Sequence, residues 1–243
     1  MAKDWFTWKG ESSAAYGIRV LELPPISIAQ ERMTYEKIAG RSGSLAMPEG
    51  DDVYEDVTLN CTCMLTDMAM LDRAMGWLRG SGKLTFANRS NGYYEARVSN
   101  QIDLNKIITS REERQFTVSF RAQPYFYLSG VEDIELTTSG ETIINPYSIA
   151  SAPRIMVYGS GDVGLSIGGQ LMILKSLDGG ILIDTALQDA LTLDGSGLLN
   201  NQMAGDFPTI PSGTSMVSWY AFDEDNNPGA VTKIVISPRW RCR

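Results

Sequence analysis

The pattern in this chain that comes nearest to a cofactor site is Gly159-x-Gly161-x-x-Gly164, followed by Asp184. In dinucleotide-binding sites such glycines bring the backbone close to a pyrophosphate, and an acid about 20 residues later binds a ribose hydroxyl. The chemistry also needs a helix directly after the glycines, because the helix N-terminus holds the phosphates. Residues 163–167 instead alternate like a strand, and Gly168-Gly169 predicts a turn. We therefore interpret the three glycines as turn and strand positions and expect no cofactor.

A second pattern, Asp223-x-Asp225-x-Asn227, has the spacing of the oxygen ligands that open a calcium-binding loop. Pro228 stands where such a loop needs glycine, and position twelve is Ile234 instead of a bidentate Glu. An acidic hairpin tip is the simpler interpretation, with calcium binding as the alternative. We expect no metal.

Catalysis finds little support in the residue types present. The carboxylates within Asp51-Asp52 and within Glu55-Asp56 would point to opposite faces of a strand, as on a solvated edge. The chain has no histidine, the usual base that activates a serine or cysteine nucleophile. We expect that the protein is not an enzyme. An enzyme hypothesis would require a pocket with convergent carboxylates of perturbed pKa.

The three cysteines, Cys61, Cys63 and Cys242, are odd in number and fit no disulfide framework. A structural zinc site needs about four Cys or His ligands, which this chain does not offer. Cys61 and Cys63 would share one face of a strand, where a small apolar pair in the core is the simpler interpretation. We expect reduced thiols, synthesis in a reducing cytoplasm, no signal peptide and no membrane span.

The net charge of −8, from 21 basic and 29 acidic residues, argues against nucleic acid as a ligand, since such surfaces concentrate cations. Up to Ser129 the chain has 15 basic and 16 acidic residues, and from Gly130 onward 6 basic and 13 acidic ones. The acidic run from Glu132 to Glu135 precedes a polar Thr/Ser/Gly segment. This shift predicts two domains, 1–128 and 129–243.

The first domain is expected to combine strands with one helix. Apolar residues at spacings of three and four predict a helix over Asp67–Arg79, capped by Thr66 and ended near Gly80. Phe116–Ala122 alternates like a half-buried strand, and Asn91-Gly92 predicts a turn between two further strands.

Between these elements and the N-terminus, Gly40 to Asp56 is glycine-rich, acidic and poor in apolar residues. This composition predicts an exposed hairpin or arm whose partners lie on another chain.

The second domain is expected to be a β-sandwich of short strands, because turn signals recur about every 8 to 12 residues. These signals are Gly159-Ser160-Gly161, Gly168-Gly169, Asp178-Gly179-Gly180 and Asp194-Gly195. Val231–Ser237 predicts a last strand before the positive cluster at Pro238–Arg241.

An aromatic cluster near the N-terminus, made of Trp5, Phe6, Trp8 and Tyr16, allows two interpretations. It either plugs the end of the core or anchors an interface, since Trp and Tyr concentrate at binding hot spots. An exposed aromatic platform for sugars is a third possibility.

Taken together, several motifs along the chain resemble the distal tail proteins of long-tailed, non-contractile bacteriophages, and the resemblance covers nearly the whole length. The motifs are Trp5-Phe6-x-Trp8-x-Gly10, Tyr16-Gly17-Ile18-Arg19-Val20, Ile38-x-Gly40-Arg41-Ser42-Gly43, Pro124-Tyr125-Phe126-Tyr127, Pro153-Arg154-Ile155-x-Val157 and Asn200-Asn201-x-Met203-x-Gly205-Asp206-Phe207-Pro208. Their order along one chain makes the resemblance specific.

This resemblance implies a mainly β fold, with a ring-forming N-terminal domain that contains one helix and a galectin-like C-terminal β-sandwich. It implies a homohexameric hub ring at the tail tip of the virion, between the tail tube protein and the tail-tip hub or tail-associated lysin. A receptor-binding protein or a host glycan would be a further partner. The expected interface residues are Trp5, Phe6, Trp8, Tyr16, Arg41 and Tyr54. The alternative function is that of a lectin-like, carbohydrate-binding β-sandwich protein.

Overall fold

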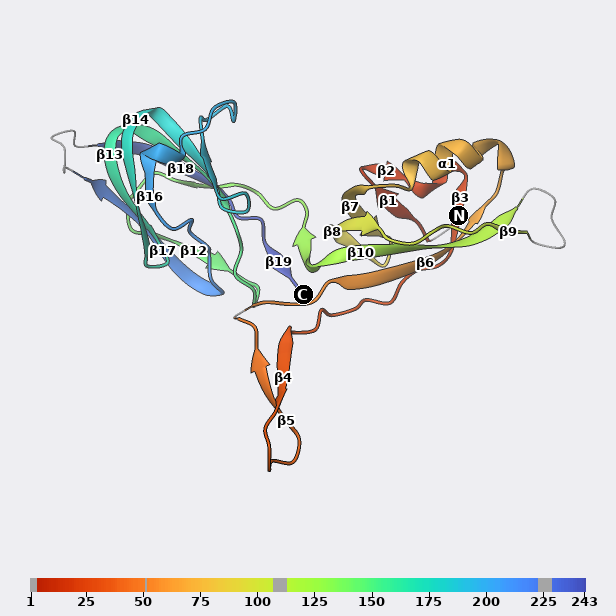
Figure 1. Ribbon diagram of the computed structural model, residues 1–243. Helices are drawn as coiled ribbons and strands as arrows, with labels where there is room; N and C mark the ends of the chain where they lie inside the picture. Colours follow the sequence, from red (N-terminus) through yellow and green to blue (C-terminus); the bar gives the residue numbers. More distant parts are fainter. Residues whose placement is uncertain (1–3, 51, 107–112, 223–228) are drawn as a thin grey trace. The chain divides into compact units, whose positions relative to one another are not determined.

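The computed structural model describes residues 4–50, 52–106, 113–222 and 229–243. Contacts between Cα atoms divide the chain into two compact units, Met1–Ser129 with Arg243, and Gly130–Cys242. Strands dominate both units, and the one α-helix of the described residues lies in the first (Figure 1). The expected mainly β fold with one helix is confirmed. No helix in the described ranges is long and apolar enough to cross a membrane.

The main sheet of the first unit is antiparallel and has the order β2-β1-β7-β8-β10-β6-β3, with β9 beside β10. Its strands are β1 (Phe6–Trp8), β2 (Glu11–Ser12), β3 (Ile18–Glu22), β6 (Val57–Leu65), β7 (Ser81–Phe86), β8 (Arg89–Val98), β9 (Asn105–Lys106) and β10 (Arg114–Leu128). A separate pair is formed by β4 (Met33–Lys37) and β5 (Ser44–Pro48). The helices are the 3-10 turns η1 (Ser13–Tyr16) and η2 (Met68–Met70) and the α-helix α1 (Leu71–Trp77).

One face of the main sheet is apolar because its strands alternate. Along β10, Phe116, Val118 and Phe120 are buried and the residues between them face outward, which confirms the predicted alternation. On β6, Cys61 and Cys63 lie on the same buried face with their Sγ atoms 3.6 Å apart. The hydrogen bond to Cys61 and burial raise the pKa of the Cys63 thiol. The two cysteines are core residues, as predicted.

The helix is shorter than predicted, and a different residue caps it. Only Leu71–Trp77 is α-helical, and the preceding turn is capped by Asp67, whose Oδ1 accepts a hydrogen bond from the Ala69 amide at 2.8 Å. The predicted cap, Thr66, instead donates its hydroxyl to the Gly17 carbonyl at 2.9 Å. The Thr66 hydroxyl thus connects the segment before η2 to the residue after η1 and does not cap the helix.

The predicted turn at Asn91-Gly92 is wrong. Phe86 pairs with Arg89, so the chain reverses at Ala87-Asn88, and Gly92 lies inside β8. A Cβ atom on Gly92 would stand 2.1 Å from the Tyr127 carbonyl oxygen. Glycine is needed there because two backbones approach closely, not because the chain turns.

The second unit consists of strands and one short 3-10 turn, η3 (Asn200–Gln202). The strands are β11 (Ile134–Leu136), β12 (Glu141–Asn145), β13 (Arg154–Ile167), β14 (Gln170–Asp184), β15 (Asp189–Leu191), β16 (Met203–Gly205), β17 (Gly213–Ala221), β18 (Ala230–Ser237) and β19 (Arg241–Cys242). β18 confirms the strand predicted over Val231–Ser237.

Two long strands, β13 and β14, organise this unit. They form a hairpin that turns at Gly168-Gly169, as predicted. The first half of β13 pairs with β18 and its second half with β17, so one hydrogen-bonded sheet curls around the core (Figure 1). The buried side chains include Ile155, Val157, Leu165, Ile167, Ile181, Ile183, Ile234 and Ile236.

Two other predicted turns are wrong, because they fall inside this hairpin. Gly159 pairs with Gly179, and the register shifts once just after Gly161. A Cβ atom on Gly159 would lie 2.4 Å from the Ala230 carbonyl oxygen, and Gly161 has a φ of +73°. The glycines therefore allow a close approach and a bulge within long strands.

Candidate assembly surfaces

The first candidate surface is a hairpin outside the main sheet. β4 pairs with β5 from Met33 opposite Pro48 to Lys37 opposite Ser44, and with the residues at its base it spans 31–54, which we call the arm. Most arm side chains are exposed, including the apolar Tyr35 at 62% and Ile38 at 44%. An exposed hairpin was predicted, and it is confirmed. It begins before the predicted start at Gly40, because its first strand precedes the glycine-rich stretch.

Backbone and ionic contacts close the base of the arm. The Arg32 amide donates to the Val53 carbonyl at 3.0 Å, and the Glu49 amide donates to the Arg32 carbonyl at 3.0 Å. The Arg32 guanidinium lies 3.2 Å from the Glu49 carboxylate and 3.5 Å from that of Glu55. These side chains are exposed, so the ion pairs add little to stability, and the backbone hydrogen bonds hold the base together.

Tyr54, an expected interface residue, connects the arm to the end of β10. Its ring meets that of Tyr125 nearly at right angles, with centres 6.0 Å apart. Both hydroxyls donate to Asp52, from Tyr125 to the carbonyl oxygen at 2.6 Å and from Tyr54 to Oδ1 at 3.0 Å. Partial burial and the bond to Asp52 raise the pKa of Tyr54. Tyr54 therefore positions the arm within its own chain.

Arg41, the other expected interface residue of the arm, lies at its tip. The Arg41 amide donates to the Ile38 carbonyl at 3.2 Å, and the flanking Gly40 and Gly43 both have a φ of +79°. The Arg41 side chain is exposed, and no carboxylate of the described residues pairs with it. Its charge is available to another chain.

The N-terminal aromatic residues lie mostly inside the first unit. Phe6 and Trp8 are fully buried, Tyr16 is 8% exposed, and only Trp5 is half-buried. A fully buried side chain has no surface for a partner. Of the two interpretations of the cluster, Phe6 and Trp8 therefore fit the one in which they are core residues. Trp5 retains part of its surface and lines a small pocket with Arg19 and Thr66.

The residue that completes this cluster, Trp77 at the end of α1, was missed by the sequence analysis. Its ring stacks on Tyr16 with centres 4.3 Å apart and on Phe6 with centres 5.6 Å apart. Trp77 lies on the buried side of this segment with Ala74 and Leu78. The helix was predicted from the spacing of Met68, Leu71, Met75 and Leu78, of which Leu78 is buried and the other three are partly exposed. Its spacing of three residues from Ala74 could have indicated that Trp77 faces the core.

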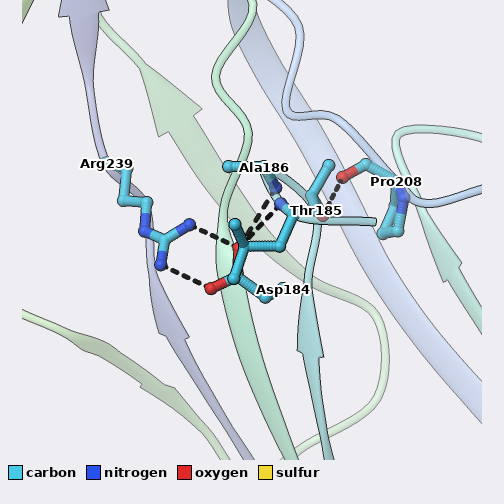
Figure 2. Close-up of polar contacts among 6 residues, drawn as sticks. Asp184, Thr185, Ala186, Pro208 and Arg239 are labelled. Carbon is cyan, nitrogen blue, oxygen red and sulfur yellow. Dashed lines mark hydrogen bonds and ion pairs between the residues drawn. The ribbon is translucent and has the colours of Figure 1, made fainter. Parts of the chain in front are cut away.

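Asp184, the candidate ribose-binding acid, holds the C-terminal segment of the second unit. Figure 2 shows its carboxylate paired with the Arg239 guanidinium. Both N–O distances are 2.7 Å, and the amides of Ala186 and Leu187 also donate to the carboxylate. Beside it, the Thr185 hydroxyl donates to the Pro208 carbonyl at 2.9 Å. Burial alone would raise the pKa of Asp184, but the hydrogen bonds and charge of Arg239 lower it.

This ion pair also holds a strained backbone. Arg239 has a φ of +50°, in the left-handed region that non-glycine residues rarely adopt. The Asp184 carboxylate is buried and accepts hydrogen bonds from Arg239, Ala186 and Leu187. The glycines 159–164 lie in a strand without a following helix. The arrangement is that of a structural clamp.

The remaining candidates for chemistry are engaged in the fold or lie outside the described residues. Asp52 binds two tyrosines, Glu55 pairs with Arg32, and Asp56 pairs with Arg121 at 2.6 Å. Asp51 and the possible calcium loop at 223–227 lie outside the described residues. Within the described ranges, no three Cys, Asp or Glu side chains gather as a metal site would require.

Comparison with known proteins gives one informative result. No model of a protein family matches the chain, and no curated protein matches its sequence. Among solved structures it is similar to the crystal structure of the Dit protein of SPP1, described as a paradigm of the hub adsorption apparatus in phages that infect Gram-positive bacteria. The TM-score is 0.70 at 16% identity, over 96% of this chain and 97% of that one. The resemblance inferred from motifs is thus confirmed in three dimensions: this chain has the fold of the SPP1 distal tail protein.

Proposed function

We propose that this protein is a distal tail hub protein that assembles as a closed ring of six copies at the tip of a phage tail. The main observation behind this proposal is the exposed arm. A two-stranded hairpin is marginal in water by itself, and exposed apolar residues such as Tyr35 and Ile38 indicate a protein partner. In a closed ring, one heterologous contact between neighbours gives every copy the same partner.

Under this proposal, residues 1–128 form the ring and residues 129–243 project from it. One side of the ring would bind the tail tube protein, and the other the tail-tip hub or tail-associated lysin. The second domain would carry or contact a receptor-binding protein. The match to SPP1 Dit over nearly the full length of both chains supports this assignment. The acidic residues considered for chemistry, such as Asp184 and Asp56, form ion pairs within the fold, which supports a function without catalysis.

The mass of the purified full-length chain in solution tests the proposal. Light scattering coupled to size-exclusion chromatography is expected to give about six times the 26.7 kDa of one chain at micromolar concentration. A single species of 26.7 kDa at all concentrations would contradict ring formation.

A second function, carbohydrate binding by the second unit, is favoured by one observation. The Tyr220 ring is 48% exposed and packs over Gly164, where a Cβ atom would stand 2.3 Å from the ring. An exposed aromatic ring of this kind can stack on a sugar. Binding of the full-length protein to a panel of bacterial polysaccharides, lost in Tyr220→Ala, would support this function. If the protein bound none of these polysaccharides, the result would contradict a carbohydrate-binding function.

A further inference from the structure

The main sheet of the first unit carries a groove whose rim includes several charged residues and which neither the core nor the base of the arm fills. The groove has a volume of about 470 Å³ and crosses β7, β8 and β10. The backbone of Gly82, Ala96 and Ala122, which pair across these strands, forms its floor, because the side chains of Ala96 and Ala122 point to the buried face of the sheet. Longer polar side chains from the adjacent positions form its walls: Ser81, Lys83, Glu95, Arg97, Arg121 and Gln123.

The charges of the groove leave one cation unmatched. Lys83 lies directly opposite Glu95, a favourable cross-strand pair. Arg97 lies directly opposite Arg121, and like charges in this position repel. Asp56 pairs with Arg121 at 2.6 Å. No described carboxylate forms an ion pair with Arg97, so the groove can accept one further negative charge beside it.

The arm carries an exposed carboxylate that has no ion pair among the described residues. Glu36, on β4, is exposed, whereas Glu49 and Glu55 are paired with Arg32. No described cation pairs with Glu36. The exposed apolar side chains of the arm favour contact with a protein surface, and an arginine without an ion pair can bind a carboxylate there.

We propose that the arm of one copy docks on the groove of a second copy, with the Glu36 carboxylate bound by Arg97 and supported by Arg121. Arginine suits this role because its planar guanidinium binds a carboxylate through two parallel hydrogen bonds. The inference rests on the proposed ring and names the contact between neighbours. The backbone floor between the outward-facing side chains leaves room for the edge of a two-stranded hairpin.

Charge exchange in the full-length protein tests this contact. Arg97→Glu and Glu36→Arg are each expected to raise the concentration for half-maximal assembly by about tenfold or more, because the lost contact is repeated around the ring. The double variant restores the attraction with reversed signs and is expected to assemble nearly as the parent does. Arg79→Glu, at an exposed position that lines neither the groove nor the pocket beside Trp5, is the matched control and is expected to assemble normally.

The outcomes separate this inference from the proposed function. A parent protein that stays monomeric contradicts both. A parent that forms rings while the single variants assemble equally well contradicts the contact and leaves the ring standing. Impaired single variants without rescue in the double variant show that Glu36 and Arg97 do not contact each other, which also overturns the inference.

Cross-linking gives an independent readout. A variant carrying Glu36→Cys and Arg97→Cys is expected to form a ladder of disulfide-linked copies under mild oxidation. The same experiment with Glu36→Cys and Arg79→Cys controls for random collision. An equal ladder in both would contradict the proposed contact.

Discussion

Trp8 and Trp77 exchange hydrogen bonds across 69 residues of sequence. The Trp8 indole N–H donates to the Trp77 carbonyl at 3.1 Å, and the Trp77 indole N–H donates to the Trp8 carbonyl at 3.2 Å. Both side chains are buried, so each polar group that burial removes from water has a partner. The exchange fixes the C-terminal end of α1 to β1, and the ring of Trp77 packs between Phe6 and Tyr16.

Replacing Trp77 by Phe is therefore expected to destabilise the first unit. The substitution retains an aromatic ring but removes one donor and some buried volume, at a cost of about 2 kcal/mol in the free energy of unfolding. Chemical denaturation measures it. Trp5→Phe, at a half-buried position, is the control and is expected to cost clearly less. Equal stability of the two variants would contradict the role assigned to the exchange.

The Asp184–Arg239 clamp predicts a pH-dependent effect. Asp184→Asn breaks a mostly buried pair and is expected to reduce stability at pH 7 by about 2–4 kcal/mol. The folded pKa of Asp184 lies below its unfolded value of about 4, so its stabilisation is present above that pH and is lost as the pH falls through the folded pKa. The difference between parent and variant is thus expected to narrow below about pH 4.

Thermal melts of parent and variant between pH 3 and 7 provide this measurement. Asp178→Asn, at an exposed position of β14, is the matched control and is expected to follow the parent at every pH. A constant difference between parent and Asp184→Asn across this range would show that the Asp184 charge is not responsible.

Removal of the arm is expected to separate folding from assembly. Replacing residues 33–48 by two glycines joins positions that already approach, because the Glu49 amide donates to the Arg32 carbonyl. The arm contributes little to the core, so the melting temperature is expected to change by only a few degrees while the large species in light scattering disappears. Loss of the cooperative melt would instead show that the arm is part of the folded unit.

The glycines of the nucleotide-like pattern are expected to matter for stability alone. Gly161→Ala places a side chain at a φ of +73° and is expected to cost about 1 kcal/mol, whereas Gly159→Ala meets the Ala230 carbonyl and is expected to cost more. Nicotinamide and flavin nucleotides are expected to leave the melting temperature unchanged. A saturable rise with nucleotide, abolished by Gly161→Ala, would restore the cofactor hypothesis.

The sequence predicted features whose causes are local. The alternation of Phe116 to Ala122 identified a half-buried strand, and Gly168-Gly169 identified a turn, because each pattern reflects its own backbone. Glycines at positions 92 and 159 were misread as turns, since glycine also serves where another strand approaches, and the approaching strand is distant in sequence. The domain limits 1–128 and 129–243 stay a prediction.

The candidate surfaces were harder to predict for the same reason. Phe6 and Trp8 are aromatic residues of a kind found at interfaces, and only the position of Trp77 reveals that they are core. The pairing of Asp184 with Arg239 spans 55 residues, and neither residue type indicates the other. The arm was recognisable in part, because a glycine-rich stretch with few apolar residues cannot bury itself.

The central claim is that six copies form a closed ring. Negative-stain electron microscopy of the purified full-length protein, with class averages computed without imposed symmetry, tests it most directly. We expect end-on views of a ring with six equivalent lobes around a central channel, and their absence from the variant that lacks residues 33–48. Uniform single particles of monomer size at concentrations where light scattering finds no larger species would contradict the claim.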